Sequence, residues 1–465
     1  MKFQFFIFFI IGLHSTYILF SQITTPTIFT YNEFIENIIK YHPISKQTEL
    51  RLVLGQTQFL KAQGNFDPLL YAEWSEKNFN EKLYYQQYAA NLRIPTLMGI
   101  DIVGGYENSR GDYLNPENST SSNGLWHLGI EIDVLQGLII NERKTTLQQA
   151  KLFRNLTNNE QQILLNELIF NASYAYLQWQ LYYNFDEVLK ENVTLANNYL
   201  YNTKQSFLGG EKTAVDTLEA YILYQDASIE QQKNYMQLIQ AKLFLENFLW
   251  YNDKAIGLSD NTQPEDFQNT LLNNPPQFVD SLSLNNNPSI LSTINKLSML
   301  EIEQKLKREK LKPKLKLKYN PLLSPSTNDI TPTYSLNNYT WGFVFSMPLF
   351  LRKERADVRE GNVKIEALTL ELANKQNELL NKIENTVQQQ LLLKKQQSLF
   401  NLNVVNYKSL LDAENEKFLF GESSVFLLNK RQEKYINARL KLIENQIKLN
   451  IEYIKYLYYT NTLVN

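Results

Sequence analysis

The sequence FLGGE at Phe207–Glu211 interrupts a run that otherwise contains no helix breaker. No Gly or Pro occurs from Asn141 to Leu208, and a second turn of the same kind, FLFGE, follows at Phe418–Glu422, 211 residues later. As a helix, the run before the first turn would extend about 100 Å at 1.5 Å per residue. A glycine stop between two such runs predicts an αα-hairpin with a tight tip.

The glycines explain how each hairpin reverses. Gly209 and Gly210 in the first turn, and Gly421 in the second, are expected to supply the left-handed residue that ends a helix. The chain then returns at once as an antiparallel partner helix. Each hairpin is therefore expected to end in a tip at the far end of a long rod.

Four sequence landmarks recur in the same order, which indicates an internal duplication. They are the segments His42–Pro68 and Asn287–Pro313, the strand openings at Trp126 and Trp341, the Glu-Arg pairs at Glu142 and Glu354, and the two FLxGE turns. The repeated unit is roughly 210–245 residues long. Each copy reads as a short helix, strands, a very long helix, the turn and another long helix.

These landmarks set the expected organisation of the chain. The first repeat is expected at 22–252, with strands at about 68–134 and a helical hairpin at 141–250. A linker rich in Pro and Asn follows at 253–287. The second repeat is expected at 288–465, with strands at about 313–348 and a helical hairpin at 354–460.

The first 21 residues combine Lys2, a hydrophobic stretch and the small or polar pair Ser21 and Gln22. This pattern predicts a secretory signal peptide at 1–21. The alternative is a membrane anchor, although His14 and its polar neighbours interrupt the apolar run. No later segment has 18 consecutive apolar residues. A membrane-spanning form of this chain would therefore have to use β-strands.

Composition argues against several classes of function. The net charge of −2 gives no reason to expect nucleic acid as a partner. The chain has no cysteine, and its two histidines outside the leader, His42 and His127, are far apart in sequence. No nucleophile elbow and no phosphate-binding loop occurs. We therefore expect no enzyme activity, no metal site and no cofactor.

Apolar and polar residues alternate in the expected strands. WHLGIEID, YTWGFVFSM and KLKLKY, which begin at Trp126, Tyr339 and Lys314, show the pattern most clearly, and 84–94 and 100–106 suggest two more strands. The pattern is typical of an outer-membrane barrel, and equally of a soluble sheet with one buried face. We expect the barrel, because of the leader and the rods. Since so few strands cannot close alone, several protomers must share it.

Apolar stripes at steps of three and four residues accompany the long helices. One stripe comprises Ile436, Leu440, Ile443, Ile447, Ile451 and Ile454; another comprises Leu372, Leu379, Ile383, Val387 and Leu391. Such spacing predicts coiled-coil packing. The expected fold is therefore mainly α, with long coiled-coil hairpins and a β-barrel portion.

The paired turns, with their flanking segments SFLGGEKTAVDTLEA and KFLFGESSVFLLNKR, and the strand end MPLFLRKERADV resemble the TolC-type outer-membrane efflux proteins. The resemblance covers essentially the whole mature chain. It implies a homotrimer with one shared barrel in outer-membrane lipid and one helical tunnel across the periplasm. It also implies docking to a periplasmic adaptor and, through it, to an inner-membrane transporter.

Two departures from the family pattern concern the first repeat. Pro68 and Trp126 are separated by about 57 residues, against 27 between Pro313 and Trp341, which leaves room for an extra hairpin. The number of strands therefore stays open. Asp133 also stands where the second repeat has Pro348.

Asp216 and Glu219 follow the first turn at helical spacing. The resemblance implies an acidic residue at the position of Asp216, and threefold symmetry would turn each of the two residues into a ring that favours cations. The alternative is that Asp216 only caps its helix, since Thr213–Asp216 has the capping-box pattern. For Glu219 the alternative is an ordinary solvated side chain on the helix surface. The second repeat has Leu427 and Lys430 at the matching positions, so a ring would come from one repeat.

The two tips are the expected contacts with the adaptor. The first comprises Leu208, Gly209, Gly210, Glu211 and Thr213; the second comprises Leu419, Gly421, Glu422 and Ser423. Exposed apolar residues beside glycine would fit between the helices of a partner hairpin. The alternative is an ordinary loop.

Three functions are consistent with this pattern. The first is the passive exit duct of a tripartite efflux pump. The second is the outer-membrane duct of a type I protein secretion system, which the sequence does not distinguish from the first. The third is a soluble periplasmic coiled-coil adaptor or scaffold.

Overall fold

A computed structural model describes residues 27–268, 283–325 and 332–463. The expected signal peptide lies outside the described residues, as do positions 269–282 of the expected linker. The described chain is mainly helical and carries one large sheet, which confirms the expected mainly α fold with long helices and a strand portion. Within these ranges, no helix combines the length and the apolar character that crossing a bilayer requires.

The elements follow one another in two unequal halves. The first half contains β1 (Thr27–Phe29), α1 (Tyr31–Tyr41), α2 (Pro43–Gln63), η1 (Gly64–Phe66), β2 (Leu69–Phe79), β3 (Lys82–Pro95), β4 (Ile100–Arg110), η2 (Pro116–Asn118), β5 (Leu125–Asp133), α3 (Glu142–Leu208) and α4 (Ala214–Glu246). Between the halves lie β6 (Trp250–Tyr251), β7 (Lys254–Ala255), β8 (Thr262–Pro264) and η3 (Ser283–Asn286). The second half contains α5 (Pro288–Glu309), β9 (Lys314–Pro325), β10 (Pro332–Ser346), α6 (Arg352–Leu419) and α7 (Val425–Thr460).

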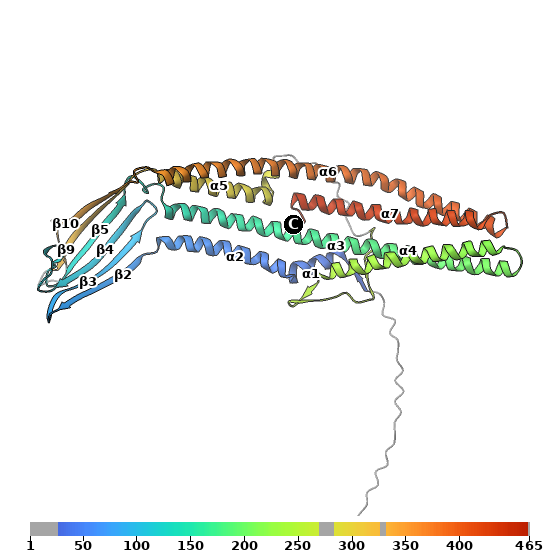
Figure 1. The fold of residues 1–465 in the computed structure, drawn as a ribbon, viewed down its shortest axis with the longest axis horizontal. Coiled ribbons are helices and arrows are strands. Elements are labelled where there is room, and N and C mark those ends of the chain that lie inside the picture. Colours follow the sequence, from blue (N-terminus) through green and yellow to red (C-terminus); the bar gives the residue numbers. More distant parts are fainter. Residues whose placement is uncertain (1–26, 269–282, 326–331, 464–465) are drawn as a thin grey trace, which may run out of the picture.

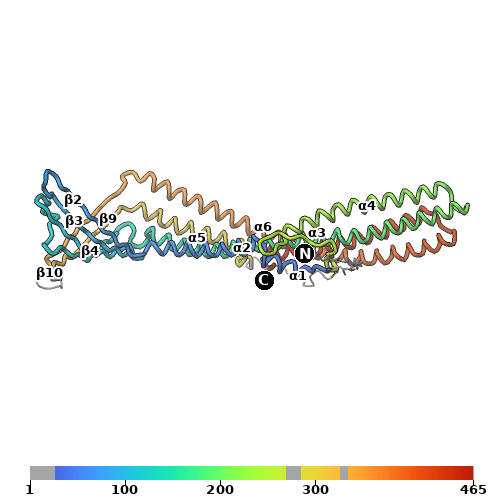
Figure 2. Tube along the Cα trace, turned by 90° about the horizontal axis from the view of Figure 1, so that it is seen from below, coloured from blue at the N-terminus to red at the C-terminus, as the bar shows by residue number. Residues whose placement is uncertain are grey.

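The molecule is a long rod with different structures at its two ends. Figure 1 shows the large sheet at one end and both hairpin tips at the other, and Figure 2 shows the same separation after a quarter turn. Helix α3, with 67 residues, and α6, with 68, run from the sheet to the tips. Each of them alone spans about 100 Å.

The sheet is open and antiparallel, with the strand order β10-β9-β5-β4-β3-β2. Four strands come from the first repeat and two from the second. The two repeats meet where β5 pairs with β9, with Glu131 opposite Lys318. The extra length before Trp126 is thus occupied by a second β-hairpin.

A two-residue turn joins β2 to β3. Asn80 and Glu81 have φ angles of 51° and 61°, so both are left-handed. Two such residues form the type I′ turn, whose twist suits a tight hairpin. The sequence analysis identified neither β2 nor this turn.

The helices form an open layer that continues from the sheet. Near the sheet, α3 packs against α2 and α5, and α5 packs against α6. Towards the tips, α3 packs against α4 and α7, and α7 packs against α6. Each level therefore contains four neighbouring helices, with α2 or α4 at one edge and α6 at the other.

The main hydrophobic core lies at mid-length, where side chains of α1, α3, α4 and α7 pack in one cluster. Its fully buried side chains include Phe34 and Ile38 of α1, Tyr176 of α3 and Leu245 of α4. The Tyr176 hydroxyl donates a hydrogen bond of 2.7 Å to the Phe29 carbonyl. That bond fixes the short parallel β1–β8 pair against the rods.

The apolar stripe expected in α7 packs in this core. Ile436, Ile443, Ile447 and Ile454 are buried, and Leu440 and Ile451 are partly buried against them. In α6, Ile383 and Val387 are buried as expected. Leu391 is exposed instead, so its assignment to that stripe is wrong.

The two hairpin tips end with the same backbone cap. Glu211 N donates to Ser206 O at 2.9 Å and Gly210 N to Phe207 O at 3.0 Å. The second tip repeats the pattern with Glu422 and Gly421 as donors. These bonds define a Schellman motif, whose left-handed position is Gly210 (φ 78°) or Gly421 (φ 76°). Gly209 is right-handed, with φ −77°, so its expected left-handed role is wrong.

Substitution by alanine should have different effects on the left-handed glycines, Gly210 and Gly421, and on the right-handed Gly209. No atom lies within 4 Å of a Cβ added at Gly210 or Gly421, so any penalty comes from the backbone alone. We expect Gly210→Ala or Gly421→Ala to destabilise its tip by about 1–2 kcal/mol. The readout is faster amide exchange in the last turn of α3 or α6. Gly209→Ala is the matched control and should leave exchange unchanged or slower; equal effects at all three positions would contradict the assignment.

Candidate functional site

One face of the large sheet is apolar and exposed across all six strands. Directly paired residues share a face, and the ladder aligns Ile102, Ile130, Tyr319 and Trp341 in one row. Trp341 is 67 % exposed and Trp74 is 63 % exposed. Other exposed residues of this face are Leu70, Tyr88, Leu92, Trp126, Leu128, Leu317, Tyr339, Phe343 and Phe345. Soluble monomers rarely expose an apolar surface of this extent.

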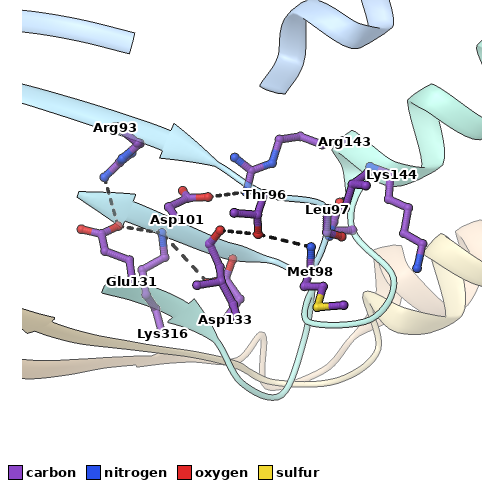
Figure 3. A network of polar contacts seen from close by, with 12 residues as sticks. Arg93, Thr96, Leu97, Met98, Asp101, Glu131, Asp133, Arg143, Lys144 and Lys316 are labelled. Atoms are coloured by element: carbon purple, nitrogen blue, oxygen red, sulfur yellow. Dashed lines mark hydrogen bonds and ion pairs between the residues drawn. The ribbon is translucent and has the colours of Figure 1, made fainter. Parts of the chain in front are cut away.

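The opposite face of the sheet is polar and charged. Near the helices it carries Arg93 on β3, Asp101 on β4, Glu131 and Asp133 on β5, and three lysines on β9, as Figure 3 shows for most of them. The sequence pattern predicted this alternation for β5, β9 and β10. It also suggested strands at 84–94 and 100–106, which lie in β3 and β4, and the structure shows that β2, which was not identified, shares the alternation.

Glu131 is the centre of an ionic cluster on the polar face. Its side chain is 7 % exposed and accepts a hydrogen bond from Arg93 at 3.0 Å. On the other side, Lys318 lies 3.0 Å away and Lys316 lies 3.6 Å away. The cluster therefore joins strands of the first repeat to a strand of the second.

A second group of ion pairs joins the sheet to the rods. Arg143 at the start of α3 donates to Asp101 at 2.6 Å, and Lys310 at the end of α5 donates to Glu142 at 2.6 Å. The Lys310 ammonium lowers the pKa of the Glu142 carboxyl, mainly through this hydrogen bond. The junction between sheet and helices is thus held by charges that the sequence analysis did not pair.

At the other end of the molecule, both tips expose apolar side chains. Leu208 is 77 % exposed, and Leu419 and Phe420 of the second tip are exposed to a similar extent. The structure places the predicted tip residues together at this end (Figure 1). Phe420 was missed, although it is the one residue by which FLFGE differs from FLGGE.

The two tips also contact each other. The Lys212 ammonium lies 4.7 Å from the centroid of the Phe418 ring, in cation–π geometry. Below them, Val425 and Leu428 of α7 pack against Tyr199 and Leu200 of α3. The hairpins therefore form one end surface rather than two separate loops.

Asp216 caps α4. Asp216 N donates to Thr213 Oγ1 at 3.2 Å, and Thr213 N donates to Asp216 Oδ2 at 2.8 Å, which completes a capping box. The backbone N–H and the hydroxyl of Thr213 both donate to the Asp216 carboxylate and hold the pKa of Asp216 below its usual value. The carboxylate is therefore ionised at neutral pH. Its role in a gate stays a prediction.

Glu219 lies apart from this cap, on the wall of a groove between α4 and α7. The groove has a volume of about 340 Å³ and is also lined by Asp226 and Glu230 of α4, and by Lys430 and Glu433 of α7. The sequence analysis singled out Glu219 but missed the two acidic residues that follow it along the same wall. Their spacing, seven and eleven residues after Glu219, is the signal that could have found them.

The described residues contain no group of three or more His, Asp or Glu side chains placed to bind a metal ion. His42 is instead buried as the N-cap of α2, where its Nδ1 accepts a hydrogen bond from Ile44 N at 3.2 Å.

Comparison with solved structures identifies the fold. The chain matches a membrane protein from Pseudomonas aeruginosa with a TM-score of 0.68 and 13 % identity, over 92 % of both chains. It matches the Campylobacter jejuni CmeC outer membrane channel with a TM-score of 0.66 and 13 % identity, over 93 % of this chain and 85 % of that one. The outer membrane protein VceC from Vibrio cholerae gives 0.64 and 12 %, over 92 % and 95 %.

No family model matches the sequence, and no curated protein matches it either. The solved structures therefore carry the comparison. They confirm the fold expected from the resemblance to TolC-type proteins.

The ionic cluster gives a test of how the two repeats are held together. Glu131→Gln leaves three cations without their shared anion, so we expect a loss of about 1–3 kcal/mol. The measurement is the denaturant midpoint of the purified protein. Glu360→Gln is the matched control, because Glu360 forms an exposed pair with Lys364 on α6 and should show no measurable change. Equal midpoints for both variants would contradict a stabilising cluster.

Proposed function

We propose that this chain forms the outer-membrane exit duct of an efflux system, as a ring of identical copies with the sheet in the lipid and the rods in the periplasm. The observation that carries the proposal is the large sheet, which is apolar and exposed on one face and charged on the other. Lipid against the apolar face and a water-filled lumen against the charged face would give each face a favourable environment. The fold shared with the CmeC outer membrane channel supports the same reading.

The open edges of the helical layer support assembly with further copies. At one edge, α4 exposes Val215, Ile222, Ile229, Met236 and Leu243, each seven residues after the last. At the other edge, α6 exposes apolar pairs seven residues apart, Val363 with Leu370 and Leu392 with Leu399, in a stripe that polar residues interrupt. A seven-residue apolar repeat is the pattern of a coiled-coil seam. Pairing α4 of one copy with α6 of the next buries both stripes, and repetition of this contact closes a ring.

We take the number of copies to be three and the lumen to be passive, as the resemblance implies. In the proposed duct, the charged face of the sheet lines one end of the lumen, and Asp216 and Glu219 lie near the other end. The adaptor is proposed to dock on the surface formed by both tips, including Phe420. The partner transporter would determine the cargo.

The proposal of an outer-membrane duct can be tested on protein purified from cell membranes. We expect recovery with the outer membrane as a trimer, and single-channel conductance after reconstitution in a planar bilayer. A soluble scaffold would instead be released with the periplasmic fraction and form no pore. That result would reject the duct.

The acidic residues near the first tip give a separate test of gating. We expect Asp216→Asn with Glu219→Gln to lower the preference for cations and to raise conductance, because a ring of carboxylates is neutralised. Thr213→Ala is the control, since it breaks the capping box of α4 but keeps both charges. If the control alters the currents as much as the double variant does, the effect comes from fraying of α4. Unchanged currents in both variants leave Asp216 as a cap only.

The tip surface should capture the adaptor. With a photo-crosslinking residue at Leu208 or Phe420, we expect one periplasmic protein with a helical hairpin to be captured in cells. A crosslinker at Leu50, which is exposed on α2 far from the tips, is the control for non-specific capture. Capture from Leu50 and not from the tips would refute docking at the tips.

A further inference from the structure

The hairpin formed by β2 and β3 has one apolar and one charged face, as the rest of the sheet does. Leu70 and Trp74 of β2, and Leu92 of β3, lie on the exposed apolar face of the sheet. Glu73 and Arg93 lie on the charged face with Glu131. A hairpin that folded away from the wall would have no reason to continue this alternation across the sheet.

Specific contacts fix this hairpin within the sheet. Arg93 on β3 reaches across β4 to Glu131 on β5, at 3.0 Å. Two hydrogen bonds hold the turn between β3 and β4 against the segment that leads from β5 into α3. Asp133 N donates to Gly99 O at 3.2 Å, and Asn141 Nδ2 donates to Leu97 O at 3.3 Å. Gly99 is left-handed, and a Cβ there would lie 2.4 Å from Gly137 O. The turn is thus packed closely against the loop that leads into α3.

The pairing leaves β2 and β10 as the two edges of the sheet. Each has one strand partner among the described residues. Strand β2 runs away from the helices and β10 runs back towards them, so a contact between these edges is antiparallel like every other pair in the sheet. Strand β2 also follows α2 and β10 precedes α6, which are the edge helices of the layer. A neighbouring copy that contacts an edge of the helical layer therefore also contacts the edge of the sheet on the same side.

The widths of the two layers agree with a six-stranded contribution. Four helices at about 8–10 Å spacing cover roughly 32–40 Å of a cylinder wall. Six strands about 4.8 Å apart, tilted by about 40°, cover roughly 38 Å. A six-stranded contribution is therefore compatible with the width of the helical layer.

We propose that β2 of one copy pairs directly with β10 of the next copy, so that each copy contributes six strands to the shared wall. The inference rests on the proposed assembly of identical copies. With three copies the wall has eighteen strands, a size at which barrels enclose an aqueous channel. The competing arrangement has the β2–β3 hairpin outside the wall and β4 as the edge that meets β10.

Disulfide trapping distinguishes the two arrangements, and the natural chain has no cysteine to interfere. Ser75 on β2 and Ser109 on β4 lie at the same level on the same face, because both pair with Gln87 of β3. They are two strands apart, about 10 Å, which is too far for one cysteine to reach both. Ser75→Cys and Ser109→Cys are each combined with a cysteine at Ser335, Thr340, Gly342 or Val344 of β10. The full-length protein is oxidised in outer-membrane vesicles and examined by non-reducing gel electrophoresis.

We expect at least one Ser75→Cys pair to give covalent dimers and trimers, and the whole Ser109→Cys series to remain monomeric on the gel. Crosslinks from Ser109 but not from Ser75 would overturn the inference and favour β4 as the edge. Absence of crosslinks from Ser75 in a protein that is trimeric by its mass in detergent would overturn it as well. A protein that is monomeric in detergent would instead reject the underlying assembly, so the two failures are distinguishable.

Discussion

Unsatisfied backbone groups at the edges of a single layer are the constraint on which this structure depends. The sheet and the helical rods are each one element thick, and both stop at open edges on the same two sides of the chain. An edge strand presents a row of unpaired N–H and C=O groups, which an apolar environment does not tolerate. An edge helix with an exposed apolar stripe also lacks a partner, although the cost there is exposed apolar surface and not unpaired backbone groups. In the proposed assembly, one contact repeated around an axis would satisfy both.

The helical part of the fold was predictable because its signals are long and local. A run of 67 helical residues without Gly or Pro has few alternatives, and the FLxGE turns mark where it must end. The strand count was not predictable for the opposite reason. The turn at Asn80–Glu81 adopts type I′ geometry without the Asn-Gly pair that announces it, and β2 alternates weakly because Tyr71 lies on the polar face. Gly209 shows the limit at single residues: the equivalent position in the second tip is Phe420, so only the following glycine is required.

The charged face of the sheet illustrates what sequence alternation leaves open. Period two placed Glu131 and the β9 lysines on one side of their strands, but pairing depends on which strands are neighbours. Strand order brings Lys318 of the second repeat opposite Glu131 of the first, and Arg93 reaches the same carboxylate from the inserted hairpin. Likewise, the capping-box pattern at Thr213–Asp216 was sufficient to predict the cap, because it is local. The groove at Glu219 is formed by α4 together with α7, so the sequence of α4 alone could predict Glu219 but not the groove.

The two repeats are equal in their helices but unequal in their strands. Each repeat supplies two helices at each level of the rod, whereas the first repeat contributes four strands to the sheet and the second contributes two. Insertion of a single strand would reverse the direction of β5, so that the chain would leave the sheet at the end away from the rods. Insertion of a hairpin keeps the direction of β5 and the even number of strands. In the proposed assembly, an even number of strands also lets copies join through antiparallel pairs alone. One extra hairpin in one repeat thus widens the sheet without altering the path of the rods.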